Sequence, residues 1–275
     1  MHSRDNYSYV TVHTNTKEVL NMSNDAIRNR GTASRSGSAE VLLADRTLLR
    51  LSATLLFVGI LLSFLAGILH PDRENANNHS AAFAEYANSG SWTAIHLGQF
   101  AGMAVIIAGL LVLFFALNVH AGTPGWAGRF GAVSAVVTLA LYGVLQAVDG
   151  VALKQAVDAW VRAPDAEKAA RFASAEAIRW LEWGVRSYQS FMLGLAFVLF
   201  ATVIVWTART PRPIGYLMGL SGLAYIVQGW VIGSEGFSAT NTAPTLLGII
   251  LILASSIWLL IIAWRMKELV AAPTR

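Results

Sequence analysis

The chain has 275 residues, of which 55% are hydrophobic and only 13% are charged, and its mean hydropathy is +0.52. Soluble domains are about a quarter charged, so this composition excludes an ordinary water-exposed surface. The absence of cysteine excludes disulfides, thiolate metal sites and a cysteine nucleophile. The net charge of +4 does not predict a nucleic-acid partner, because the basic residues lie mostly beside apolar segments.

The N-terminal segment, residues 1–46, is rich in Ser, Thr, Asn and Arg and poor in apolar residues. This composition predicts a disordered cytoplasmic tail. The segment holds no hydrophobic stretch of the kind that a secretory signal needs. We expect a membrane domain over residues 47–265 and a second cytoplasmic tail over 266–275.

Six apolar stretches follow the tail, each about long enough to cross a ~30 Å hydrocarbon core, which takes roughly 20 helical residues. Strands are not expected, because the runs are too long and do not alternate apolar with polar residues. We therefore predict an all-α integral membrane protein. It is a six-transmembrane-helix bundle with short inner loops and a longer, partly helical third (outer) loop, whose two short interfacial helices break at Pro164. The predicted helices cover residues 48–69, 93–118, 130–152, 180–207, 213–234 and 244–265.

The positions of Lys and Arg predict the orientation of the bundle. Most of the 20 basic residues lie in the two tails, the second loop and the fourth loop. The positive-inside rule then places both termini in the cytoplasm, in a plasma (inner) membrane of bacterial type. The third loop is the exception, with five basic residues balanced by acids. Four tryptophans are expected in an aromatic belt at the outer interface: Trp92, Trp160, Trp180 and Trp183.

Glycines one helical turn apart predict close helix packing. Such pairs let two backbones approach closely, so we expect helices 2 and 5 to be tightly packed within the bundle. The pairs are Gly98–Gly102, Gly215–Gly219 and Gly229–Gly233.

Polar side chains gather in the outer halves of helices 2 to 5. On three of these helices they follow i, i+4, i+7 spacing, which places them on one face; Tyr142, Gln146 and Asp149 are one such stripe. Polar groups in a membrane cost least when they face the bundle interior or a wet cavity. We therefore predict an outward-open polar pocket, with helices 1 and 6 packed around it. Its candidate residues are His96, Gln99, Tyr142, Gln146, Asp149, Glu182, Arg186, Gln189, Tyr225 and Gln228.

Each charged candidate also has a plainer interpretation. Asp149 lies about one membrane length, roughly 20 residues, from the inner end of its helix, which equally fits the headgroup region. Glu182 is expected at the interface. Arg186 lies one turn deeper, where an arginine costs ~2.5–3.5 kcal/mol, so it should snorkel or pair with Glu182 or Asp149.

Three classes of function fit these features. The favoured one is binding or transport of a small polar solute or ion, by a homo-oligomer, since six helices are few for a lone transporter. The second is a membrane enzyme with a divalent metal on His96, Asp149 and Glu182, although the sequence has neither HExxH nor GxSxG. The third is a non-catalytic structural or partner subunit. No cofactor is predicted; a b-type haem is disfavoured because His96 has no histidine at its depth on another helix.

Overall fold

The computed structural model of the protein describes residues 46–71 and 73–265, and within these residues all regular structure is helical. Six of the helices are long and apolar enough to cross a membrane. The predicted all-α six-helix bundle is therefore confirmed, and the chain has the character of a polytopic membrane protein. The predictions for the two tails lie outside the described residues, except at Arg46, which begins the first helix.

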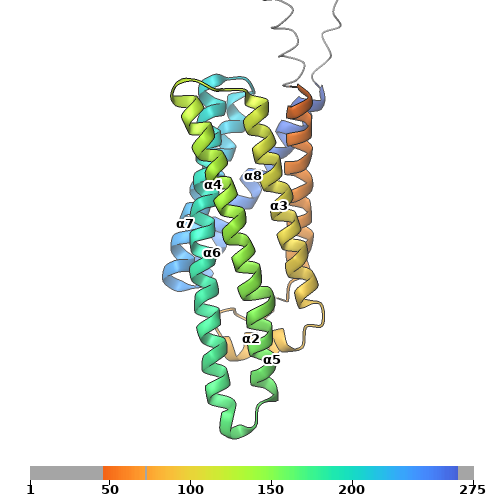
Figure 1. Cartoon of the computed structure of the whole chain (residues 1–275), viewed down its shortest axis with the longest axis vertical. Coiled ribbons are helices and arrows are strands. Elements are labelled where there is room, and N and C mark those ends of the chain that lie inside the picture. The colour runs from red at the N-terminus through yellow and green to blue at the C-terminus, as the bar shows by residue number, and fades with distance from the viewer. Residues whose placement is uncertain (1–45, 72, 266–275) are drawn as a thin grey trace, which may run out of the picture. The chain divides into compact units, whose positions relative to one another are not determined.

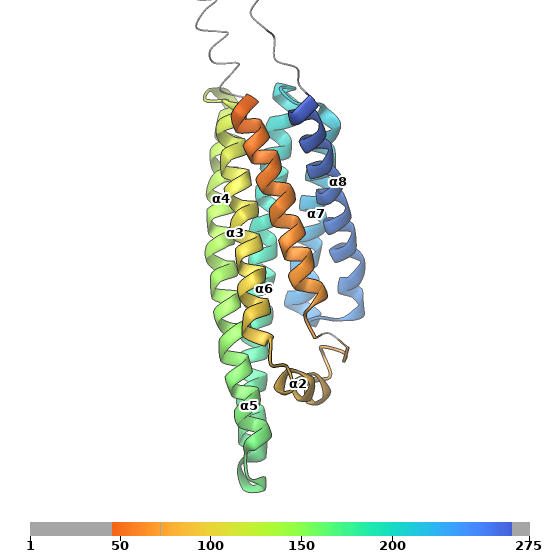
Figure 2. The ribbon, with the colours of Figure 1, turned by 90° about the vertical axis from the view of Figure 1, so that its right-hand side faces the viewer.

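Four of the six long helices closely match their predicted ranges, because each is a single apolar run between polar loops. They pack side by side in the bundle (Figures 1 and 2). A short 3₁₀ turn, η2 (Ala239–Asn241), precedes the last of them. The four are the first helix (Arg46–Ile68), α3 (Trp92–Leu117), α7 (Arg212–Glu235) and α8 (Thr242–Arg265).

The other two long helices form a hairpin that runs past the ends of its neighbours (Figure 1). One arm is continuous through α4 (Gly122–Ala147), the π-helical segment η1 (Val148–Leu153) and α5 (Lys154–Arg162). The other arm is α6 (Asp165–Thr207), whose 43 residues are about 65 Å long, roughly twice the hydrocarbon thickness.

The two predicted helices of the third loop and their break at Pro164 are present, but these helices are not short and separate. The helices of that segment continue the two flanking spans, and only Ala163 and Pro164 lie between the arms. The physical reason is that the segment is rich in alanine and has no proline except Pro164. Proline disfavours helical backbone at the residue before it, so the chain turns there and nowhere earlier.

A short helix that was not predicted, α2 (His79–Ala87), packs against α5 beside the hairpin (Figure 2). It closes a second, smaller hydrophobic core, separate from the main core of the bundle. Trp92, which we expected in the aromatic belt at the outer interface, belongs to this core and is only 1% exposed, so its ring packs inside the protein. The buried members of the second core are Ala82, Phe83, Tyr86, Trp92, Leu153, Val157 and Ala175.

Close glycine contacts hold the long helices together. A Cβ atom built on Gly194 of α6 would lie 2.5 Å from the carbonyl oxygen of Gly222 on α7, and the reverse distance is 2.6 Å. A Cβ on Gly229 of α7 would lie 2.8 Å from the carbonyl oxygen of Ser187, and one on Gly102 of α3 would lie 2.8 Å from the amide nitrogen of Ser63. The expected close packing is thus present: α7 packs on α6, and α3 packs on the first helix.

The backbone contact between α6 and α7 can be tested by substitution of its glycines. Gly194→Ala should lower the melting temperature of the purified protein, because overpacking costs about 1–3 kcal/mol. Gly184→Ala is the matched control on the same helix, since a Cβ there meets no atom within 4 Å. Replacing a mid-helix glycine by alanine in open space should stabilise by about 0.5–1 kcal/mol. Equal effects of the two substitutions, measured by thermal unfolding in detergent, would refute this contact.

Candidate functional site

The candidate site begins at η1, where the α4–α5 arm adopts a π-helical turn that carries Asp149 and Gly150. Such turns are rare and frequently lie at functional sites. Gly150 faces α3 so closely that an added Cβ would lie 2.7 Å from the Cβ of His96. The glycine therefore allows η1 to approach the start of α3, and this approach places Asp149 beside His96.

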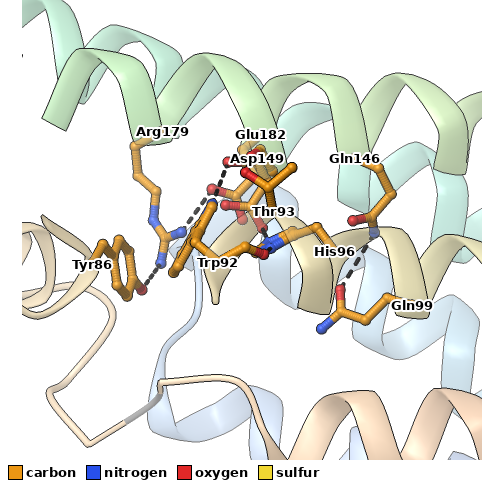
Figure 3. Close-up of polar contacts among 10 residues, drawn as sticks. Tyr86, Trp92, Thr93, His96, Gln99, Gln146, Asp149, Arg179 and Glu182 are labelled. Atoms are coloured by element: carbon orange, nitrogen blue, oxygen red, sulfur yellow. Dashed lines mark hydrogen bonds and ion pairs between the residues drawn. The ribbon is translucent and has the colours of Figure 1, made fainter. Parts of the chain in front are cut away.

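Trp92 connects the two segments through its backbone and its side chain (Figure 3). Its indole Nε1–H donates to the carbonyl oxygen of Asp149 at 3.0 Å. Its own carbonyl oxygen accepts a hydrogen bond from His96 Nδ1 at 2.8 Å. One buried residue thus fixes both the backbone of η1 and the orientation of the imidazole.

The imidazole of His96 contacts Asp149 through its other nitrogen, with Nε2 2.9 Å from Oδ2. A carbonyl oxygen only accepts hydrogen bonds, so Nδ1 must carry a hydrogen. A neutral ring then turns the lone pair of Nε2 toward the carboxylate, and two acceptors do not attract each other. The contact therefore requires a cation between the two atoms, either a proton or a metal ion. The second carboxylate oxygen of Asp149, Oδ1, is buried and has no hydrogen-bond partner.

A second ion pair lies next to the first. Arg179 of α6 donates to Glu182 Oε2 at 2.7 Å and to the hydroxyl of Tyr86 at 3.1 Å, and its guanidinium carbon lies 5.0 Å from the centre of the Phe237 ring. Both charged side chains are only 3% exposed. Glu182, which we expected at the interface, is therefore buried among protein side chains. The reason is that α2, which the sequence did not reveal, supplies Tyr86 to cover this face of α6.

Arg186 has different partners from those expected. Because Glu182 pairs with Arg179, Arg186 donates instead to Gln189 Oε1 at 3.3 Å. Its guanidinium carbon lies 5.9 Å from the centre of the Tyr142 ring. Two of the predicted stripes, on α4 and α6, thus meet here.

The remaining predicted residues also contact one another or adjacent helices. Gln146 donates to Gln99 at 3.4 Å, which joins the stripes of α4 and α3. Gln228 accepts a hydrogen bond from Ser190 at 3.1 Å and donates to Thr245 of α8 at 2.8 Å, while Tyr225 packs against Phe197. The α8 helix therefore takes part in the polar contacts, although it was expected only to surround them.

Two hollows of about 620 Å³ and 470 Å³ lie elsewhere in the described part of the chain. The first lies between α6 and α7, and the second lies between the first helix and α8. None of the ten predicted pocket residues lines either hollow. At the site itself the polar side chains pack against one another.

Sequence reasoning did not place Tyr86 or Arg179 at the site, and it discounted a second histidine near His96, a position that His70 occupies. His70 follows the first helix, and its ring centre lies 5.1 Å from that of His96 and 4.9 Å from that of Trp92. No periodic signal could have found it, because the course of a loop is set by tertiary packing. Arg179 could have been found from its i, i+3 spacing to Glu182, which is typical of a helical ion pair.

No protein-family model matches the chain, and no curated protein or solved structure shows significant similarity to it. What the site can do follows from its contents: two imidazoles, two carboxylates, one guanidinium and a phenol at one end of α3.

The buried ion pair between Arg179 and Glu182 can also be tested by substitution. Arg179→Met should cost about 3–5 kcal/mol, because it leaves the charge of Glu182 buried without a partner. The double variant Arg179→Met/Glu182→Gln should recover much of that loss. Arg171→Met is the matched control on the same helix, since Arg171 pairs with Glu167 where both are about half exposed, and it should cost less than about 1 kcal/mol. Chemical denaturation in detergent measures all three, and a double variant no more stable than Arg179→Met would contradict the pairing.

Proposed function

We propose that the protein binds or transports a small cation at the cluster around His96 and Asp149. The observation that carries this proposal is the contact between His96 Nε2 and Asp149 Oδ2. With Nδ1 hydrogen-bonded to Trp92, a neutral imidazole presents its Nε2 lone pair to the carboxylate, so the two atoms need a proton or a metal ion between them. A cation between these atoms turns a repulsive contact into an attractive one. The unpartnered Oδ1 of Asp149 offers a further oxygen ligand.

The charges of the cluster support a cation over an anion. Figure 3 shows Glu182 beside Asp149, with the guanidinium of Arg179 directed toward Glu182. With neutral histidines, the two carboxylates and one guanidinium sum to a single negative charge. A buried net charge is costly in a low-dielectric interior, and a bound cation removes that cost.

The packing of the cluster supports an ion over a larger solute. His96 is 2% exposed and Asp149 14% exposed. The rings of Tyr86, Trp92 and His96 pack in sequence, with centre-to-centre distances of 4.4 Å and 4.5 Å. This close packing of rings around the imidazole favours a small ion over a sugar or an amino acid. Of the two kinds of ligand expected from the sequence, a small polar solute or an ion, we therefore favour an ion.

The orientation of the protein is part of the same proposal. The excess of Lys and Arg in the tails and in the α3–α4 and α6–α7 connections supports a plasma membrane location with both termini in the cytoplasm. The α5–α6 hairpin, and with it the cation cluster, then lies on the outer side, where external ions reach it.

Cysteine labelling tests this orientation without background, because the natural sequence has no cysteine. Ala166→Cys, exposed beside the turn of the hairpin, should react with a membrane-impermeant maleimide in intact cells. Ala121→Cys, exposed between α3 and α4, should react only after the membrane is permeabilised. The reverse pattern would overturn the proposed orientation.

Ion-dependent stabilisation tests the function itself. The probes are the chlorides of Na⁺, K⁺, Mg²⁺, Ca²⁺, Mn²⁺ and Zn²⁺, added to the purified chain in detergent after dialysis against a chelator. At least one should raise the melting temperature, since a ligand at 100 times its Kd stabilises by about 2.7 kcal/mol. Asp149→Asn should abolish that increase.

The control is Asp165→Asn, which changes an exposed aspartate at the start of α6 and should keep the full response. If no ion stabilises the wild-type protein, or if Asp149→Asn responds as the wild type does, the proposal fails. A lower stability of Asp149→Asn without any ion response in either protein would instead favour a purely structural role for the cluster.

A further inference from the structure

We propose that His70, His96 and Asp149 form a binding site for a divalent transition-metal cation, for which Zn²⁺ is the best-matched probe. This inference rests on the proposed function and names the class of its ligand. It also assigns a role to His70, and it leaves Glu182 out of the metal site, because Glu182 pairs with Arg179.

The three side chains already lie near coordination geometry. One ligand atom from each lies within 4.8 Å of the other two, and His96 Nε2 and Asp149 Oδ2 are 2.9 Å apart. A tetrahedral zinc ion with bonds of about 2.0–2.1 Å holds its ligand atoms about 3.3 Å apart. His70 lies in the connection after the first helix, and a movement of the ligand atoms from within 4.8 Å of one another to this spacing would complete the set.

The hydrogen-bond partners of the ligands are of the kind found around metal-binding histidines. A metal-binding histidine typically donates its other N–H to a carbonyl or carboxylate, which fixes the tautomer and aims the lone pair at the metal. His96 does this through Nδ1 and the carbonyl oxygen of Trp92. The indole of Trp92 also holds the backbone carbonyl of Asp149. Trp92 is therefore a positioning residue for two of the three ligands.

The donor set selects the metal. Two imidazoles and one carboxylate suit zinc and neighbouring transition metals, whereas Mg²⁺ and Ca²⁺ prefer six or more oxygen ligands. Three protein ligands leave the fourth tetrahedral position for water or another small ligand. The single carboxylate gives the site a negative charge, which attracts a cation. The neighbouring Arg179–Glu182 pair is neutral overall and does not cancel that charge.

Zinc binding to the full chain, purified without a histidine tag and stripped of metal, tests the inference by isothermal titration calorimetry. The wild-type protein should bind a single Zn²⁺ tightly, and Mg²⁺ should not compete. His70→Gln should weaken the affinity at least about tenfold, and Asp149→Asn should do the same. The same variants should lose the visible absorption of bound Co²⁺, which reports tetrahedral coordination.

His120→Gln is the matched control, because His120 lies in the connection between α3 and α4, at the opposite end of both helices from the cluster. It should bind Zn²⁺ as the wild type does. The melting temperature of metal-free His70→Gln shows that this variant is folded. The inference is wrong if Zn²⁺ does not bind, or if His70→Gln binds it with unchanged affinity.

These results separate the inference from the proposed function. If another ion of the panel stabilises the protein through Asp149 while Zn²⁺ does not bind, the zinc site is wrong and the cation site stands. If no ion does so, both are wrong. Zinc bound equally by wild type, His70→Gln and Asp149→Asn would indicate adventitious binding and would likewise refute the site.

Discussion

The close approach of η1 to the start of α3 is the contact on which the charged cluster depends. It is possible because Gly150 has no side chain where the helix meets His96, and because the π-helical turn widens the α4–α5 arm at that point. The hydrogen bonds of Trp92 then hold both segments in place. A side chain at position 150 would push Asp149 away from the imidazole and would separate the two halves of the cluster.

The contact between His96 and Asp149 is buried, so any unpaired charge in it is energetically costly. Charged groups inside a helical bundle are costly unless each finds a partner, and Arg179 and Glu182 meet that requirement through their own ion pair and the hydroxyl of Tyr86. His96 and Asp149 satisfy it when a proton or a metal ion lies between Nε2 and Oδ2. The two pairs therefore differ, since Arg179 and Glu182 attract each other through their own charges, whereas the contact between His96 and Asp149 depends on a proton or a metal ion held between them. The cation proposal follows from that difference.

Much of the fold could be predicted from the sequence, because each apolar run meets the bilayer separately and its length alone indicates a span. The polar stripes were also informative: His96 meets Asp149, Gln99 meets Gln146, and Arg186 lies over Tyr142. What could not be predicted depends on tertiary packing. α2 has no strong pattern of its own, and His70 reaches the cluster only through the course of a loop. The burial of Trp92 and Glu182 was not predicted, because nothing in the sequence showed that α2 and the hairpin would cover them.

The most direct test of the cation site is a crystal structure of the full chain grown with Zn²⁺, with anomalous diffraction recorded at the zinc absorption edge. We expect an anomalous peak about 2.0–2.1 Å from His96 Nε2 and within bonding distance of Asp149, with Nδ1 still hydrogen-bonded to the Trp92 carbonyl oxygen. A map with no peak there, and an imidazole turned so that Nε2 no longer faces Asp149, would contradict it.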